Sequence, residues 1–146
     1  MSLVTRIGFT GTRKGLTQEQ SKSLSTLFEI KDEIESFHFG DCVGADHDFY
    51  ELVRPLFWTK SKFVGHIPEN SELRVFLQYH EEWRPRPYLD RNRDIVRCCT
   101  RLIACPGEKA EQPRSGTWST IRYAVNIKRP VTLVYPDGEI KTVYQD

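Results

Sequence analysis

The sequence has few cysteines and no long apolar run, and each shortage excludes a class of protein. No Cys-x-x-Cys pair occurs among its four cysteines, which are Cys42, Cys98, Cys99 and Cys105. Reduced thiols are therefore expected rather than a disulfide framework. A zinc site would require these thiols to converge with a histidine (His38, His47, His66 or His80), and no spacing indicates this. We therefore expect no metal and no cofactor. No apolar segment approaches the length that spans a bilayer, so no membrane contact is expected.

The chain also lacks a strong charge of either sign. Its formal net charge is +1 over 146 residues, which argues against a general polyanion binder but leaves room for a local basic site. We find no internal repeat, no low-complexity stretch and no secretory signal, so a cytoplasmic protein is expected. The length is typical of one domain, spanning residues 1–146, with a modest core.

Short apolar runs alternate with amphipathic ones along the chain. The runs predict strands at 4–9, 34–39, 63–67, 101–105 and 131–135, and helices at 17–28, 46–57, 88–99 and 115–127. Thr17 and Gln20 have capping-box spacing at one helix start. Residues 139–144 are a candidate edge strand, and 69–87 is interpreted as a long loop with a helical turn. The pattern predicts an α/β, Rossmann-like open sheet of about five strands, mostly parallel, with helices on both faces.

Glycine and small polar residues follow three of the predicted strands, where open α/β sheets bind ligands. The first loop contains Gly11, Thr12 and Arg13. The glycine permits close backbone approach, and the guanidinium has a donor geometry suited to phosphate. An ordinary strand-to-helix turn explains this loop equally well.

The second glycine-containing loop opens the helix at 46–57. Gly40 and Gly44 are four residues apart, so free backbone N–H groups are expected to point outward at the helix start. Asp41 is a candidate acceptor for a ribose hydroxyl. For Asp46 we favour a helix-capping role over a ligand contact.

The third loop and a basic segment complete the candidate ligand-binding set. Backbone amides and hydroxyls of Ser115, Gly116 and Thr117 are placed to wrap an anion, and Trp118 is either a stacking platform for a base or a core residue. Arg91 and Arg93 lie two apart in a predicted helix and cannot share a face. One of them is expected to face the site and the other solvent.

These motifs, in this order, resemble those of the SMF/DprA–LOG superfamily of Rossmann-like proteins. The matching pieces are Gly11-Thr12-Arg13, Gly44-Ala45-Asp46, Arg91-Asn92-Arg93 and Ser115-Gly116-Thr117. The likeness runs from about Ile7 to Pro136. It implies a nucleotide-type small molecule as the ligand, and it implies a homo-oligomer because members of the superfamily commonly associate.

The resemblance to the LOG branch implies a phosphoribohydrolase, which cuts the N-glycosidic bond of a nucleoside monophosphate. Its signature resembles Pro-Gly-Gly-x-Gly-Thr-x-x-Glu, and the Gly-Thr pair maps onto Gly116 and Thr117. The glutamate then falls on Thr120, which cannot act as a carboxylate base. Pro113 and Arg114 replace the paired glycines. The phosphate cradle is kept, whereas the catalytic carboxylate is missing from its usual place.

Three functions follow from these observations. The first is binding of a nucleotide or nucleotide-derived signal, to sense or sequester it. The second is a nucleotide N-glycosidase, whose catalytic candidates are Asp41 and Arg93 and whose carboxylate would otherwise come from Asp46, Glu51 or Asp94. The third is single-stranded DNA binding of the DprA type. It ranks below nucleotide binding because the chain is near neutral and only partly shows aromatic–basic interleaving.

Overall fold

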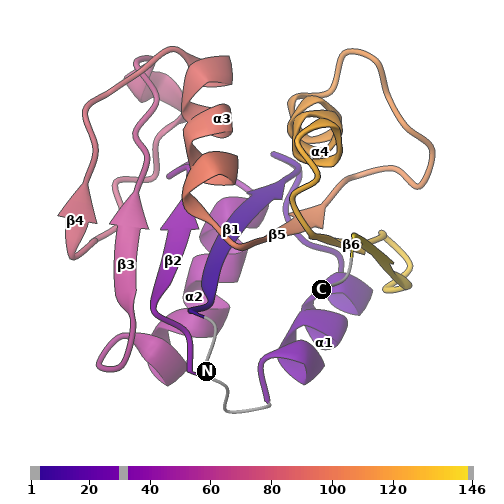
Figure 1. The fold of residues 1–146 in the computed structure, drawn as a ribbon, viewed down its shortest axis with the longest axis horizontal. Helices are drawn as coiled ribbons and strands as arrows, with labels where there is room; N and C mark the ends of the chain where they lie inside the picture. Colours follow the sequence, from indigo (N-terminus) through magenta and orange to yellow (C-terminus); the bar gives the residue numbers. More distant parts are fainter. Residues whose placement is uncertain (1–3, 30–32, 145–146) are drawn as a thin grey trace.

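A mostly parallel, seven-stranded sheet runs through the protein, whose computed structural model describes residues 4–29 and 33–144 (Figure 1). The strand order is β4-β3-β2-β1-β5-β6-β7, and only β6 and β7 pair antiparallel. The α/β, Rossmann-like class and the mostly parallel sheet are confirmed. The expected number of about five strands was too low.

The elements lie close to their predicted positions. The strands are β1 (Arg6–Gly11), β2 (Ser36–Phe39), β3 (Lys62–Gly65), β4 (Glu81–Glu82), β5 (Arg101–Cys105), β6 (Val131–Val134) and β7 (Ile140–Val143). The helices are α1 (Gln18–Leu27), α2 (Ala45–Phe57), α3 (Tyr88–Cys98) and α4 (Gly116–Asn126), with a short 3-10 helix, η1 (Ser71–Leu73). The capping box at Thr17 and Gln20 is present at the start of α1.

The two additional strands have different origins. Strand β7 is the candidate edge strand, and it pairs with β6 along its whole length. Strand β4 lies within 69–87, the segment interpreted as a loop, and pairs in parallel with β3 through two residues only. Two residues carry no detectable alternation of apolar and polar side chains, so the sequence pattern could not reveal β4.

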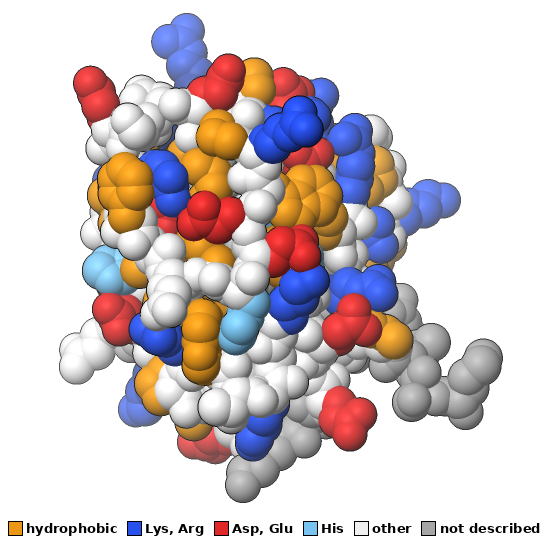
Figure 2. Space-filling view, turned by 90° about the vertical axis from the view of Figure 1, so that its left-hand side faces the viewer, with side chains coloured by type: hydrophobic (Ala, Val, Ile, Leu, Met, Phe, Trp, Pro, Cys, Tyr) orange, Lys and Arg blue, Asp and Glu red, His pale blue; other side chains and the backbone are white. Residues whose placement is uncertain are grey.

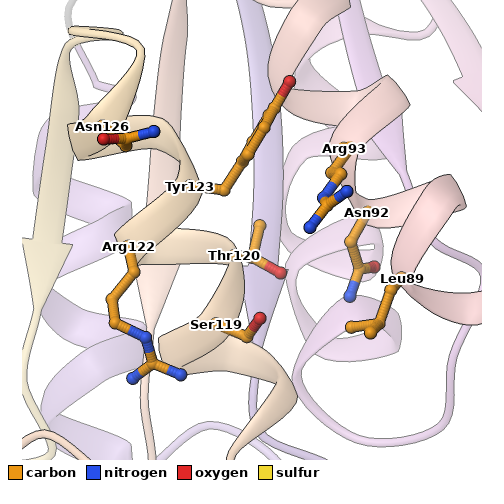
Figure 3. Close-up of a pocket in the computed structure, with 8 residues that line it drawn as sticks. All are labelled: Leu89, Asn92, Arg93, Ser119, Thr120, Arg122, Tyr123 and Asn126. Atoms are coloured by element: carbon orange, nitrogen blue, oxygen red, sulfur yellow. The ribbon is translucent and has the colours of Figure 1, made fainter.

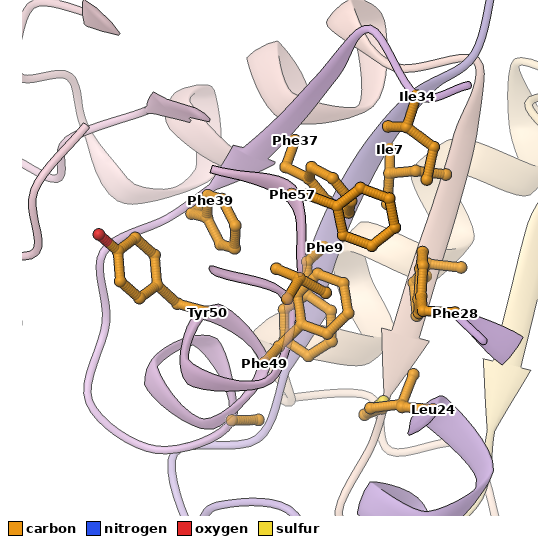
Figure 4. Packing of buried hydrophobic residues seen from close by; sticks show 14 of the residues in the cluster. Ile7, Phe9, Leu24, Phe28, Ile34, Phe37, Phe39, Phe49, Tyr50 and Phe57 are labelled. Carbon is orange, nitrogen blue, oxygen red and sulfur yellow. The ribbon is translucent and has the colours of Figure 1, made fainter. Parts of the chain in front are cut away.

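Aromatic rings fill the core between the sheet, α1 and α2 (Figure 4). Seven of the eight phenylalanines lie in this cluster, and the rings of Phe9 and Phe49 stack at a centroid distance of 4.4 Å. Large rings bury much apolar area per residue. They compensate for a hydrophobic content of 38% and hold α2 firmly against β1.

Helices α3 and α4 cover the opposite face of the sheet. Their second, smaller core includes Ile95, Leu102, Trp118 and Val131. The expectation of helices on both faces is therefore confirmed. Within 4–29 and 33–144, no helix combines the length and the apolar character required to cross a membrane.

The order of the strands determines where a ligand crevice forms. The chain proceeds outward from β1 through β2 and β3, and then returns to place β5 on the other side of β1. Loops after β1 and β5 consequently diverge, which opens a crevice at the carboxyl ends of these strands. The candidate site lies at this edge.

Candidate functional site

The loop after β1 packs directly on the start of α2. Gly11 ends β1, and a Cβ atom added there would lie 2.5 Å from Cβ of Ala45. The backbone N–H of Thr12 donates to the Cys105 carbonyl at 3.1 Å, and the Thr12 carbonyl accepts from the Ala45 N–H at 2.9 Å. Only glycine permits this approach, which holds the loop against both β5 and α2.

Gly44 supports the same loop from the side of α2. It has a φ of +94°, and a Cβ atom there would lie 2.4 Å from the carbonyl oxygen of Arg13. Gly44 therefore fits against the backbone of Arg13 and does not line the cavity described below. The structure therefore does not bring Gly44 to the cavity with the other candidate residues, because it packs against the backbone of Arg13.

Asp46 does not cap α2, contrary to the role that the sequence favoured. The N-cap is Gly44, which has no side chain, and Asp46 is the second helical residue. Its Oδ2 accepts from the N–H groups of Gly40 and Cys42 at 3.0 and 3.4 Å. Burial raises the pKa of this carboxyl to about 6. The side chain therefore shapes the turn after β2 and also lines the cavity.

Asp41 is fully buried and is not available to a ligand. Its carboxylate accepts from the side chains of Arg74 and Tyr79 at 2.6 and 2.7 Å, and from the N–H groups of Phe76 and Leu77 at 3.2 and 2.9 Å. The interpretations of Asp41 as a ribose acceptor and as a catalytic candidate were therefore wrong. Its carboxylate instead anchors the segment that follows η1.

Arg91 reaches the turn after β2 from the first turns of α3. Its guanidinium donates through Nη1 to the Gly40 carbonyl and through Nη2 to Sγ of Cys42, the latter at 3.5 Å. The side chain is only 3% exposed, and its buried Nε has no partner in the described part of the chain. A buried guanidinium that lines a cavity and makes no ion pair with a described residue is well suited to an anionic ligand.

The other arginine of this motif faces elsewhere. Arg93 lies over the ring of Tyr123 and lines a separate groove of about 390 Å³ between α3 and α4 (Figure 3). The sequence-based expectation that the two arginines face different sides is met, because a separation of two residues turns a helix by about 200°. The interpretation of Arg93 as a catalytic and ligand-binding residue does not fit this position.

The start of α4 supplies the third wall of the site. Ser115 is the N-cap, and its Oγ accepts from the N–H of Trp118 at 3.2 Å. Ser115, Gly116 and Thr117 line the cavity, whereas Trp118 is 5% exposed and lies in the second core. The stacking role considered for Trp118 was therefore wrong, and its core interpretation holds.

Thr120, at the position of the LOG glutamate, also points away from the cavity. It lines the groove between α3 and α4, and its hydroxyl donates to the Gly116 carbonyl at 2.9 Å (Figure 3). The hydroxyl of Thr120 is therefore hydrogen-bonded within its own helix, and Thr120 contributes no acid or base to the cavity.

The loops after β1 and β2, the start of α3 and the start of α4 enclose a cavity of about 410 Å³. Of the candidate residues, the structure brings together Gly11, Thr12, Arg13, Gly40, Asp46, Arg91, Ser115, Gly116 and Thr117. Several further lining residues were absent from the candidate set: Lys14, Cys42, Tyr88, Asn92 and Arg114. Most of them lie next to or within one of the motifs that the sequence analysis identified. Including the residues that flank each motif would therefore have found them.

Positive charge dominates the cavity wall. It carries Arg13, Lys14, Arg91 and Arg114, and the ion pairs among the described residues include none of these four. Asp46 is the single carboxylate in the described lining. The positive end of the α4 dipole adds to the same field. The arrangement therefore favours a ligand with at least two negative charges.

The raised pKa of Asp46 predicts pH-dependent anion binding. Between pH 7 and pH 5 this carboxyl takes up a proton, since its pKa is about 6, and the cavity loses its negative charge. We expect the affinity for sulfate, which keeps its charge over this range, to rise about fivefold, or about 1 kcal/mol. Calorimetric titrations at both pH values measure the change. Asp46→Asn should bind sulfate with little pH dependence, and an equal slope in the two proteins would contradict the assignment.

Comparison with known proteins identifies solved structures of the same fold. DNA processing protein A (DprA) of Streptococcus pneumoniae aligns with a TM-score of 0.61 at 17% identity, over 89% of this chain and 50% of that one. The DprA of Helicobacter pylori, studied for its single-stranded DNA binding mode, aligns with a TM-score of 0.58 at 16% identity, over 88% of this chain and 64% of that one.

A third structure, TM1055, aligns with a TM-score of 0.55 at 14% identity, over 88% of this chain and 72% of that one. The chain thus spans half to about two thirds of the length of the two DprA chains. No protein-family model and no curated protein matches its sequence. The structural likeness establishes a fold shared with DprA, as the resemblance to the SMF/DprA–LOG superfamily implied.

Proposed function

We propose that this protein binds a nucleotide or a nucleotide-derived small molecule, with its phosphate in the cavity between the β1 loop, α3 and α4. The observation that carries the proposal is the set of four cations that line this cavity, Arg13, Lys14, Arg91 and Arg114, none of which makes an ion pair with a described residue. Because a buried cation without a counter-charge is unfavourable, a bound phosphate would supply the negative charge that the described residues do not provide.

The size and shape of the site support a small ligand. A volume of about 410 Å³ falls within the range of small-molecule pockets. The hydroxyls of Thr12, Ser115 and Thr117 line the same wall as the free amides at the start of α4. Helix N-termini of this kind bind phosphate groups in many α/β proteins.

A role in holding the ligand is favoured over a role in cutting it. Glycosidases use a pair of carboxyl groups, whereas Asp46 is the single carboxylate in the described lining. Burial also raises the pKa of the Cys42 thiol, which disfavours its nucleophilic thiolate form. If the protein were an N-glycosidase, free base would accumulate from a nucleoside monophosphate during long incubation. Release that disappears in Asp46→Asn would support hydrolysis and overturn a pure binding role.

Single-stranded DNA binding is the second candidate, because the H. pylori DprA structure concerns that ligand. The face beside β4 shows hydrophobic side chains interleaved with both basic and acidic ones (Figure 2). Acidic side chains on this face oppose a strand of phosphates. A gel shift that strengthens with oligonucleotide length and weakens steeply with salt would favour DNA over a small nucleotide.

The direct test of the proposal is to identify what the protein carries. We expect mass spectrometry of the protein purified at low salt to show one copurifying phosphate-bearing small molecule. Calorimetry with mono-, di- and cyclic nucleotides and ADP-ribose should then give one site per chain for the matching compound. The control variant is Arg93→Gln, which removes an arginine from the groove between α3 and α4 and leaves the lining of the cavity intact. Absence of binding across the whole panel would overturn the proposal.

A further inference from the structure

Three side chains of metal-ligand type meet on the sheet face that α3 covers, and none of them lines the cavity. His38 belongs to β2, His66 follows β3, and Cys98 is the last residue of α3. One ring nitrogen of each histidine and Sγ of Cys98 all lie within 4.8 Å of one another. The sequence showed no such convergence, because the three positions lie far apart in the chain.

The parallel register of β2 and β3 creates the histidine pair. Phe37 and Phe39 of β2 point into the first core, so His38 faces the opposite side of the sheet. His38 pairs in register with Val64, and the N–H of His66 donates to the Phe39 carbonyl at 2.8 Å. His66 lies two residues after Val64, so its side chain points to the same face of the sheet as His38 and lies beside it.

The hydrogen bonds of this pair leave one ring nitrogen unused. Nδ1 of His38 lies 2.8 Å from Nε2 of His66, and Nε2 of His38 lies 2.9 Å from Oγ of Ser36. Nδ1 of His66 is buried and has no partner in the part of the chain that the structure describes, although the residue is only 1% exposed. The neutral ring of His66 can therefore carry its proton on Nδ1, which leaves the lone pair of Nε2, the nitrogen beside His38, available to a metal.

Both histidines of the cluster are in the neutral form that a metal ligand requires. Burial lowers the pKa of His38 to about 4 and that of His66 to about 3, so both rings are neutral at neutral pH. A neutral imidazole has a free lone pair, which is the form that binds a metal. Burial raises the pKa of the Cys98 thiol, and a bound metal would replace its proton. Cys98 is half-buried, which leaves a path for an ion to enter.

We propose that His38, His66 and Cys98 bind a Zn²⁺ ion. Zinc prefers nitrogen and sulfur ligands, with bond lengths of about 2.0–2.1 Å to nitrogen and about 2.3 Å to sulfur. Tetrahedral coordination places such ligands about 3.3–3.6 Å apart. Nδ1 of His38 and Nε2 of His66 would exchange their mutual hydrogen bond for the metal, and the thiolate of Cys98 would move toward them. A water molecule completes the fourth position, as no further ligand-type side chain belongs to the described cluster.

Metal titration tests this site without any assay of nucleotide binding. The protein is first stripped with EDTA and dialysed, and Zn²⁺ is then titrated in competition with a chromophoric chelator. We expect one equivalent of Zn²⁺ to bind, and Co²⁺ to give the near-ultraviolet charge-transfer band of a thiolate ligand. Alkylation of Cys98, followed by peptide mass spectrometry, should slow when Zn²⁺ is present.

Matched variants distinguish this cluster from adventitious binding. Cys98→Ser and His66→Gln should each weaken Zn²⁺ affinity by at least about tenfold. Cys42→Ser removes another half-buried thiol, and His47→Gln removes a half-exposed histidine, so both should keep the stoichiometry of the parent protein.

Circular dichroism shows whether each variant is folded. If the His66→Gln variant does not fold, because its side chain is buried, then the Zn²⁺ affinity of Cys98→Ser alone tests the proposal. Absence of stoichiometric binding overturns the proposal, as does binding that survives in a folded Cys98→Ser or His66→Gln variant, or that follows Cys42 or His47 instead. Nucleotide binding has a separate site, so failure of either proposal leaves the other standing.

Discussion

Arg91→Met is expected to weaken binding of the phosphate-bearing ligand by about 100-fold. The guanidinium is almost fully buried, lines the cavity and makes no ion pair with a described residue. Charge-assisted hydrogen bonds of this kind contribute about 1.5–3 kcal/mol, which corresponds to about 10–150-fold in affinity. Calorimetry with the ligand identified by mass spectrometry, or with inorganic pyrophosphate as a probe, measures the loss. Methionine keeps most of the buried volume, so the loss reports the missing donors.

Arg93→Met is the matched control for this prediction. It removes the same charge two residues along α3, from a side chain that lies over Tyr123 in the other groove. We expect the ligand affinity to change by less than about threefold, because salt screens the effect of an exposed charge that does not line the cavity. Equal losses in the two variants would show that binding depends on overall charge and would contradict the assigned site. Urea denaturation of both variants separates a loss of ligand contact from a loss of folding.

Gly44→Ala is expected to lower the free energy of unfolding by about 2–4 kcal/mol. Its φ of +94° is unfavourable for any residue with a side chain, and the added Cβ would lie 2.4 Å from the Arg13 carbonyl oxygen. Backbone strain and overpacking each cost about 1–3 kcal/mol. The backbone atoms of Arg13 cannot move aside as a side chain can, because the preceding Thr12 is hydrogen-bonded to both β5 and α2. Urea denaturation followed by circular dichroism measures the change.

Gly107→Ala provides the comparison at a second loop glycine. A Cβ atom there would meet only the side chain of Thr12, at 3.1 Å, and the backbone lies outside the region that favours glycine. We expect a cost below about 1 kcal/mol. If Gly44→Ala is equally mild, then the loops after β1 and β2 are not held together in the way that the structure indicates. Ligand affinity should fall in Gly44→Ala as well, since Arg13 would be displaced.

Local patterns in the sequence were sufficient for the fold class and for the general location of the site. Apolar periodicity distinguished strands from helices, and the capping box at Thr17 and Gln20 located the start of α1. The carboxyl ends of parallel strands meet at one edge, so glycine-containing loops after successive strands had to lie together. This reasoning correctly grouped the loop after β1 with the start of α4.

The roles of individual charged residues depended on tertiary contacts. Asp41 and Asp46 lie in the same short loop, yet Asp41 turns to the segment after η1 and Asp46 turns to the cavity. Which aspartate lines the cavity depends on what packs on each side of the turn, and no local pattern encodes this. The same holds for Trp118, whose place in the second core follows from the contact of α4 with the sheet.

The sequence by itself determined the α/β order, the positions of the glycine-containing loops and the opposite orientation of Arg91 and Arg93, because these depend on neighbours within one or two helical turns. Only the tertiary structure decided which arginine enters the cavity. It also decided that β4 joins the sheet and that His38, His66 and Cys98 converge. The physical reason is the same in each case. Strand register and helix docking join residues that are distant in the chain, and their contacts leave no periodic trace in the sequence.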